Sequence, residues 1–409
     1  MISHSNSSSQ NFASGTVWTG DCLEIMRGMN SETVDLIYLD PPFNSNANYA
    51  APIGSAAAGA AFKDTWSLSD VDAEWINLIE QKHPVVHRVL LAAMTDSDKS
   101  YLAYMAARLL EMPRLLKPTG SIYLHCDPTM SHYLKLLMDA IFGRRRFRNE
   151  IIWCYRGGGV PRRDFARKHD VILRYSLGVP TFNVDAVRIP YSDSVTDSLP
   201  SRYDKSYRTN KVYSGYKPNQ KGKHPEDWWP IQPLMPSDRR ERVGYPTQKP
   251  LALLDRIIRA SSNERDMVLD PFCGCATTLV AADRIDRHWV GIDLSAKAAE
   301  LVVERVEADQ GLWRNIVHRE DIPQRTDLGP LPAYNSAANK QQLYGQQGGD
   351  CAGCGTHFQP QHLTVDHIIA QSKGGTDHID NLQLLCGHCN SIKGDRGMEY
   401  LKSKLQLVS

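Results

Sequence analysis

An apolar run at residues 36–39, which predicts a buried strand, is followed at once by Asp40, Pro41, Pro42 and Phe43. The two prolines fix the backbone and remove two N–H donors. The Asp40 carboxylate and the Pro41 carbonyl are therefore free to accept hydrogen bonds, and Phe43 offers a ring for stacking. This set suits a planar group that carries an amine. Taken alone, the tetrapeptide favours a plainer interpretation, a surface acid before a Pro-Pro turn.

A second group of chemically capable residues lies near the C-terminus, where two Cys-x-x-Cys pairs occur 35 residues apart. Nine cysteines are an odd set, and five of them are scattered. In a chain expected to be cytoplasmic, the paired spacing favours a metal over disulfides. Four thiolates make a closed, structural zinc site, and a segment this short needs the metal to fold. The predicted zinc ligands are Cys351, Cys354, Cys386 and Cys389.

The elements that must position these residues follow from the hydrophobic pattern. Strand patterns alternate with helical patterns through most of the first 312 residues, which predicts an α/β fold with a parallel sheet covered on both faces. One helix is expected to begin with Asp127 as its N-cap and to end at Gly143. After the irregular residues 155–245, helical and strand patterns return from residue 249.

Residues 266–293 read as a strand, a loop around Gly274, a helix and a second strand that ends in Asp293. Doubly wound folds bind ligands at the carboxyl ends of their strands, where an acid can hold ribose hydroxyls. The segment lacks a G-x-G-x-x-G pattern, which argues against a dinucleotide.

Bulk composition limits the function classes. The chain has 409 residues and a formal net charge of +1, and it has no apolar run long enough to cross a membrane. Residues 1–14 read as a disordered, Ser-rich tail without the apolar core of a signal peptide, so we expect a cytoplasmic protein without membrane contact. Residues 144–174 carry ten Arg or Lys against three acids, and residues 201–224 are basic and Tyr-rich. Each run alone is usual for a solvated surface, but together they favour contact with a polyanion.

The order of these motifs resembles the β class of amino-DNA methyltransferases. In that class the Asp-Pro-Pro-aromatic motif comes first, followed by a recognition region, a Thr-Gln-Lys-Pro-type motif and the cofactor loop. This chain has Asp40 to Phe43, the basic insertion, Thr247 to Pro250, and then Asp270 to Thr277. The resemblance covers residues 15–312, with target recognition at about 155–245. The residues that it implies for binding S-adenosylmethionine are Asp21, Lys249, Asp270, Phe272, Gly274, Thr277 and Asp293.

By this resemblance Asp40, Pro41, Pro42 and Phe43 are the catalytic residues, acting on a base flipped out of double-stranded DNA. Asp at the first motif position favours adenine N6 over cytosine N4. The cofactor loop reads Gly-Cys-Ala-Thr where the family usually has Gly-Ser-Gly-Thr, and Ala276 restricts the backbone there. Members of the class often form homodimers.

Residues 351–396 resemble the HNH endonuclease family with a zinc-stapled ββα-metal core. The resemblance implies that His367 is the general base, that Asn381 orients it, and that Asp366 and Asn390 hold a catalytic magnesium or manganese ion. Asn390 stands where the family often has His. We expect a linker at 313–348 and the HNH zinc domain at 349–409.

The sequence thus predicts a site-specific DNA methyltransferase with a tethered HNH endonuclease or nickase, an arrangement suited to restriction-modification. An alternative is a methyltransferase whose zinc domain only binds DNA. A third is a methyltransferase that acts on RNA.

Overall fold

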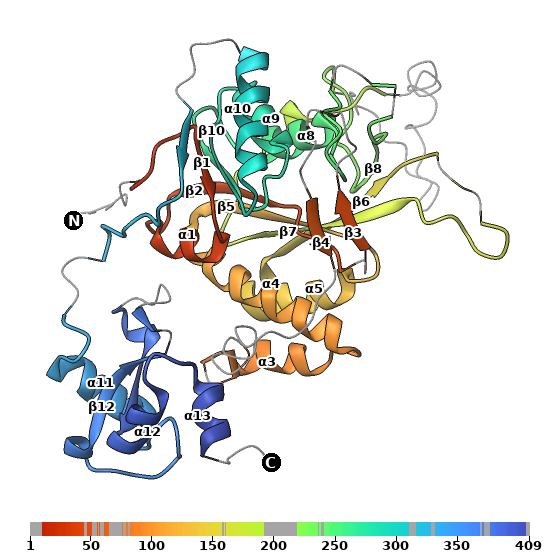
Figure 1. The fold of residues 1–409 in the computed structure, drawn as a ribbon. Coiled ribbons are helices and arrows are strands. Elements are labelled where there is room, and N and C mark those ends of the chain that lie inside the picture. The colour runs from red at the N-terminus through yellow and green to blue at the C-terminus, as the bar shows by residue number, and fades with distance from the viewer. Residues whose placement is uncertain are drawn as a thin grey trace, which may run out of the picture.

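The fold is described from a computed structural model of the chain (Figure 1). It describes residues 10–44, 47–50, 55, 57, 61–64, 76, 79–80, 82–157, 159, 161–191, 219–235, 237–238, 241–310, 316–328, 332–368, 370–371 and 377–405. Residues 1–9 of the expected tail and residues 201–218 of the second basic stretch lie outside the described residues. Phe12 belongs to the described part of the expected tail, and it is buried against Trp18.

A nine-stranded sheet forms the centre of the larger part of the described chain. Its order is β11-β1-β10-β9-β2-β5-β7-β6-β8. In that order the strands are Val317–Arg319, Thr16–Thr19, His288–Asp293, Met267–Asp270, Val34–Leu39, Leu116–Cys126, His169–Ser176, Phe147–Cys154 and Trp228–Pro230. A separate hairpin consists of β3 (Ala47–Ala50) and β4 (Ala61–Asp64).

The sheet is mixed, whereas the strand-helix alternation predicted a parallel one. Strand β7 is antiparallel to both β5 and β6. The reason is local, because the described residues between β6 and β7 form no crossover helix, and a short connection returns the chain antiparallel. From β11 to β5 all neighbours are parallel, and the strand order reverses between β9 and β2. This reversal is a topological switch point, where such folds bind ligands.

Helices cover both faces of the sheet (Figure 1). Alternate residues of β2 show the division, since Ile37 and Leu39 belong to one apolar core and Leu36 and Tyr38 to the other. The helices of the first core are α1 (Cys22–Gly28), α3 (Pro84–Leu91), α4 (Asp96–Leu115) and α5 (Ser131–Phe142). Those of the second are α8 (Leu251–Ser261), α9 (Thr277–Asp283) and α10 (Ala296–Gln310).

Helix α5 begins at Ser131 with Met130 as its N-cap, three residues after the expected N-cap Asp127. The Asp127 carboxylate accepts a hydrogen bond from the Met130 N–H, so it closes a turn ahead of the helix. The C-terminal end is as predicted, because Gly143 follows the helix with φ +90°.

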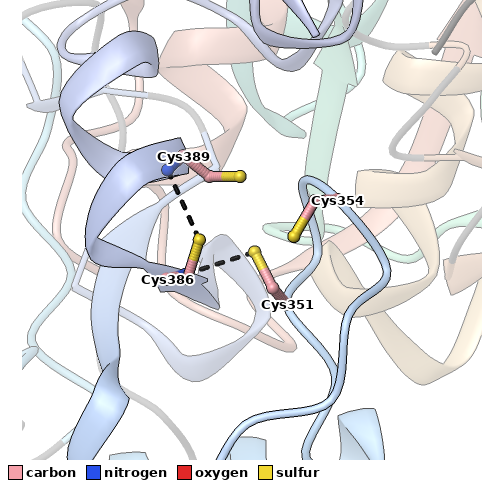
Figure 2. A group of neighbouring side chains, drawn as sticks. All are labelled: Cys351, Cys354, Cys386 and Cys389. Carbon is pink, nitrogen blue, oxygen red and sulfur yellow. Dashed lines mark hydrogen bonds between the residues drawn. The ribbon is translucent and has the colours of Figure 1, made fainter.

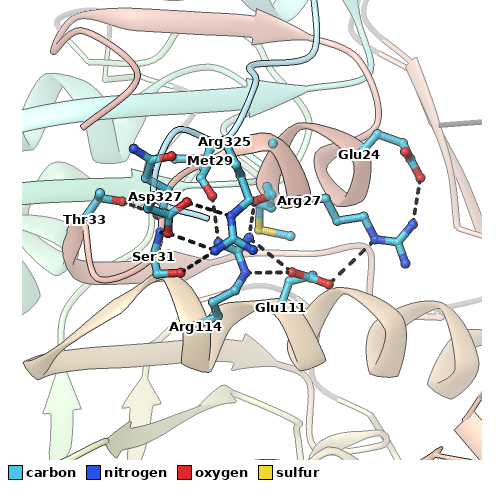
Figure 3. Close-up of polar contacts among 12 residues, drawn as sticks. Glu24, Arg27, Met29, Ser31, Thr33, Glu111, Arg114, Arg325 and Asp327 are labelled. Carbon is cyan, nitrogen blue, oxygen red and sulfur yellow. Dashed lines mark hydrogen bonds and ion pairs between the residues drawn. The ribbon is translucent and has the colours of Figure 1, made fainter. Parts of the chain in front are cut away.

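The segment expected to be a linker, 313–348, carries β11 and the helix α11 (Ala337–Gln347), and residues 323–327 dock onto the loop between α1 and β2. Figure 3 shows Arg325 and Asp327 against Ser31. The Ser31 N–H donates to Asp327 over 2.8 Å, and Arg325 pairs with Asp327 at 2.9 Å. A side chain on Gly28 would meet the Pro323 carbonyl oxygen at 1.8 Å, so the two backbones touch. We call residues 323–327 the docked tether.

The C-terminal unit has its own apolar core. It contains α11, the antiparallel pair β12 (Leu363–His367) and β13 (Leu382–Cys386), and the helices α12 (Gly387–Lys393) and α13 (Met398–Lys404). A strand pair followed by a helix agrees with the expected ββα arrangement. Within the described part of the chain no helix has the length and apolar content to cross a bilayer.

Candidate methyltransferase and nuclease sites

A cavity of about 500 Å³ opens at the switch point, at the carboxyl ends of β2, β9 and β10. This volume is in the range of small-molecule sites. The motif after β2 and the loop after β9 are more than 200 residues apart in sequence, yet both line it. The predicted residues among its lining are Asp40, Pro41, Pro42, Phe43, Lys249, Asp270, Phe272, Gly274, Thr277 and Asp293.

The two oxygens of the Asp40 carboxylate have different surroundings. Oδ2 accepts a 2.6 Å hydrogen bond from the Lys249 ammonium, which also lies 5.1 Å from the centre of the Phe43 ring. Oδ1 is buried and has no hydrogen-bond partner among the described residues. A buried acceptor without a donor is unfavourable unless a ligand supplies one. Lys249, expected to bind cofactor, therefore holds the carboxylate in place.

Behind Asp40, a buried network fixes the orientation of His125 at the end of β5. The Tyr38 hydroxyl lies 2.8 Å from His125 Nδ1, and Asp170 Oδ2 lies 3.1 Å from Nε2. Tyr155 donates to the other oxygen of Asp170. An ionised carboxylate only accepts, which assigns the ring proton to Nε2 and leaves Nδ1 to accept from Tyr38.

Electrostatics agree with this assignment. Burial raises the pKa of Tyr38 and keeps its hydroxyl protonated. Burial also acts to raise the pKa of Asp170, but the hydrogen bond from His125 outweighs it, together with the Lys249 charge and the hydrogen bond from Tyr155, and the pKa of that carboxyl is lowered. The His125 ring stacks on Phe43 with 5.6 Å between centroids, so the network supports the aromatic residue of the first motif.

The cofactor loop is held by the acids that end β9 and β10. Asp293 accepts from the N–H groups of Gly274 and Ser295 at 2.9 Å each, and Asp270 accepts from Phe272 at 3.0 Å. Burial raises the pKa of Asp270 to about 7 and also raises that of Asp293. Two acids with raised pKa values at one cavity form a site that a cationic ligand would stabilise.

Ala276 precedes α9 with φ +68° and ψ +19°, the left-handed conformation that glycine tolerates best. Ala276 therefore adopts a conformation suited to glycine, at the expense of strain of about 1–2 kcal/mol.

Asp21 is the one predicted cofactor residue that does not line the cavity, although its neighbours Gly20 and Cys22 do. It caps α1 and forms a salt bridge with the buried Arg108, with both carboxylate oxygens 2.8 Å from Arg108 Nη2. Arg108 in turn lies 3.3 Å from the centre of the Tyr104 ring, which does line the cavity.

In the C-terminal unit the four predicted cysteine ligands converge (Figure 2). Their sulfur atoms all lie within 4.8 Å of one another. The N–H of Cys386 points at the sulfur of Cys351 over 3.2 Å, and that of Cys389 at Cys386 over 3.5 Å. Four sulfurs at this separation, with backbone donors that favour thiolates, fit one tetrahedral metal ion.

His367 ends β12 with its Nε2 atom 2.7 Å from Asp377 Oδ1, and its ring packs on Tyr334. The Asp377 carboxylate accepts a hydrogen bond from the Nε2–H group, which leaves Nδ1 as the unprotonated, basic nitrogen. Asn381, expected to orient His367, lies next to it in the structure. The backbone carbonyl oxygen of Asn381 accepts a hydrogen bond from the N–H of Ile368, the residue that follows His367.

Asp366 Oδ2 accepts from two groups, the buried Lys393 ammonium at 3.0 Å and Gln383 at 2.9 Å. The other oxygen, Oδ1, takes no part in these two contacts and is the one that a hard cation could take. Asn390 lies on α12, the helix that also carries Lys393. Of the two residues expected to hold magnesium, Asp366 thus has one carboxylate oxygen already paired with a cation.

The comparisons with known proteins bear on both units. Residues 34–304 match the family described as DNA methylase, of the N6 and N4 amino-methyltransferases. This chain belongs to the DNA methylase family. Residues 351–396 of this methyltransferase match the family described as HNH endonuclease, so an HNH domain follows the methylase region.

Several characterised relatives align with the methyltransferase over about seven-tenths of its length. The type II methyltransferase M.HpaI from Haemophilus parainfluenzae is 26% identical over 71% of this chain and 73% of its own. The DNA adenine methyltransferase YhdJ from Escherichia coli is 27% identical over 71% of this chain and 82% of its own. Among solved structures, the M1.HpyAVI–SAM complex covers 71% of this chain and 98% of its own at 18% identity and a TM-score of 0.41.

Sequence reasoning missed the residues that support the methyltransferase site from behind. His125 ends a strand pattern and Asp170 begins another, which was the available signal. Neither residue belongs to a recognised motif, and only the pairing of β5 with β7 brings them together. Asp377 was missed in the same way, since its role depends on how the loop before Asn381 folds.

Proposed function

We propose that this methyltransferase transfers a methyl group from S-adenosylmethionine to the N6 amine of adenine in double-stranded DNA. The observation that carries the proposal is Asp40 Oδ1, a buried acceptor that receives no hydrogen bond among the described residues and has His125 Nδ1 3.9 Å away, in the same cavity as the cofactor loop.

The chemistry follows from the properties of a base amine. Its lone pair is delocalised into the ring, so attack requires the nitrogen to become more tetrahedral. Asp40 Oδ1 and the Pro41 carbonyl oxygen can accept its two protons and favour that geometry. Lys249 fixes the carboxylate through the other oxygen. Phe43, backed by His125, is the surface against which the flipped base packs.

The cofactor site fits a cation with a ribose. Asp270 and Asp293 supply negative charge, and Phe272 and Gly274 supply an apolar wall and a close backbone approach. These residues, together with Thr277, would hold S-adenosylmethionine, which supplies the methyl group. The choice of adenine rests on Asp at the first motif position and on the relative YhdJ, a DNA adenine methyltransferase.

The test is methyl transfer from labelled S-adenosylmethionine to plasmid DNA, with chelator present to suppress cutting. Digestion to nucleosides should give N6-methyladenine, and Asp40→Ala should abolish it. Exclusive N4-methylcytosine would overturn the base assignment. Label transferred to structured RNA but to no duplex DNA would overturn the substrate class.

We propose further that the HNH domain hydrolyses DNA phosphodiesters. His367 Nδ1 takes the proton from the attacking water, and Asp377 stabilises the charged imidazole. Asp366 and Asn390 would hold magnesium or manganese, which stabilises negative charge at the phosphate.

A DNA clamp without cleavage is the competing function for this domain, and Lys393 favours it. Its ammonium is 1% exposed and already neutralises Asp366, the residue expected to bind the metal.

Cleavage of plasmid DNA decides between the two. Unmethylated and previously methylated plasmid are incubated with magnesium or manganese and no S-adenosylmethionine, with His367→Ala as the control. Cutting that requires His367 supports the nuclease, and its loss on methylated DNA supports restriction-modification. Tight DNA binding with no cutting by the wild-type protein under any of these conditions supports the clamp.

A further inference from the structure

The connection between β6 and β7 carries an exposed basic surface with an aromatic ring at its centre. Phe165 has 98% of its surface exposed, and the residues around it are also exposed apart from the half-buried Lys168. In Figure 1 this yellow-green connection extends away from the body beyond the end of β6. We call its cations the basic arm: Arg156, Arg162, Arg163, Arg167 and Lys168.

The composition of the arm selects its partner. A single exposed phenyl ring is common on protein surfaces, but this ring lies within a run of five cations, and basic residues with an interleaved aromatic are typical of a nucleic-acid contact. A protein groove could take the ring, but five cations against the single acid Asp164 would then remain unneutralised. Duplex DNA satisfies both features, because phosphates pair with the cations and base faces accept the ring.

The root of the arm is joined to the base site. The Tyr155 N–H donates to the Lys168 carbonyl oxygen over 3.0 Å, which closes the arm at its base. The Tyr155 hydroxyl donates to Asp170, which holds His125, and His125 stacks on Phe43. The arm therefore leaves the fold beside the residues that support the base site.

Resting on the proposed function, we propose that the arm distorts the duplex for base flipping. The cations bind phosphates that flank the target, and Phe165 inserts into the base stack and fills the gap left by the extruded base. Insertion of an apolar side chain lowers the free energy of the unstacked duplex, so that the flipped state becomes populated.

The test compares two duplexes that share the sequence found methylated in the plasmid assay, one intact and one with an abasic site in place of the target base. Wild-type protein should bind the abasic duplex at least tenfold more tightly, since its gap is already open. Phe165→Ala should lose this preference, and Phe165→Trp should keep it.

The matched control is Arg163→Ser, which should weaken binding of both duplexes equally and lower the salt dependence by about one phosphate contact. A Phe165→Ala variant that still prefers the abasic duplex would overturn the proposed insertion of Phe165 into the base stack. Because the readout is binding, a wild-type protein that methylates the intact duplex but shows no preference for the abasic one would overturn this insertion and leave the proposed function in place.

Discussion

At the scale of single residues, the site depends on carboxylates whose ionisation is opposed by burial. Asp270 is 2% exposed, and its pKa is raised to about 7 by burial, with Asp40 and Asp293 adding to the rise. A cationic ligand prefers the ionised carboxylate. Below pH 7 the free protein carries this group protonated, so ligand binding must remove a proton.

The affinity for S-adenosylmethionine should therefore fall as the pH decreases through 7, by up to tenfold for each further pH unit. It should be nearly constant above pH 8. Titration calorimetry between pH 5.5 and 8.5 measures this, and Asp270→Asn should bind weakly with a flattened pH dependence. A steep dependence that survives in Asp270→Asn would assign the proton to another group.

Ala276 gives a stability prediction at the same scale. A β-branched residue is strained at φ +68° far more than alanine is. Ala276→Val should reduce the free energy of unfolding by about 1–2 kcal/mol more than Ala281→Val. Ala281 is a similarly buried alanine inside α9, so it controls for overpacking. Denaturant unfolding gives the free energy of unfolding of both variants. An equal decrease in the two would show that the left-handed backbone at residue 276 adds no strain to the valine variant.

At the scale of elements, two sheet pairings assemble the support of the base site. Strand β5 brings His125, β7 brings Asp170, and Tyr155 follows β6. The antiparallel ladders β5–β7 and β7–β6 place these residues together without any help from the first motif.

Asp170→Asn should lower kcat for methyl transfer by roughly 10–100-fold, the effect of losing a charged hydrogen bond of about 1.5–3 kcal/mol. Cofactor affinity should stay unchanged, because Asp170 does not line the cavity. The control is Asp139→Asn, which removes an acid that also accepts from a tyrosine, Tyr175, outside the site. A matching loss in the control, or a change in cofactor affinity alone, would argue against positioning.

The amino-acid sequence predicted some of these strands and helices correctly and others wrongly. The strand before Asp40 and the strand-loop-helix at Asp270 were predicted correctly. In both cases a run of apolar residues ends abruptly at an acid, and this pattern is compatible with few structures other than a buried strand. The antiparallel direction of β7 was not found, since direction depends on which strand pairs with it. The start of α5 was misplaced because Asp127 and Pro128 fit a helix start as well as they fit the turn that forms.

At the scale of the whole molecule, the methylase region and the C-terminal unit have separate apolar cores. The core of the C-terminal unit is small and includes Cys351, Cys386 and Cys389 themselves. Without a metal, four thiols would be buried close together, and the small apolar core would contribute too little free energy to keep the unit folded.

We predict that the protein holds one zinc ion per chain and that a strong chelator unfolds the C-terminal unit alone. Calorimetry should show two transitions, of which the chelator removes one and leaves the methylase transition in place. Cys389→Ser should lose the zinc, whereas Cys154→Ser, outside the cluster, should retain it. Zinc that remains bound in Cys389→Ser, measured by elemental analysis, would contradict the assignment.

Four cysteines at metal-ligand spacing identify this site from the amino-acid sequence alone, because the chemistry of thiolates leaves few other uses for the pattern. The docked tether was not foreseen, and residues 313–348 were expected to be a linker. Its contacts are made by backbone groups and by scattered polar and charged side chains that carry no periodic signal.

The docked tether also sets a length. The chain leaves the methylase region at Asp327, and Tyr334 already packs on His367. A fully extended chain spans at most about 3.6 Å per residue, so these seven residues reach roughly 25 Å. Along a duplex with about 3.4 Å per base pair, that is about seven base pairs. In the nuclease proposed above, so short a connection would confine the cuts to a narrow window around the base that the methylase region holds.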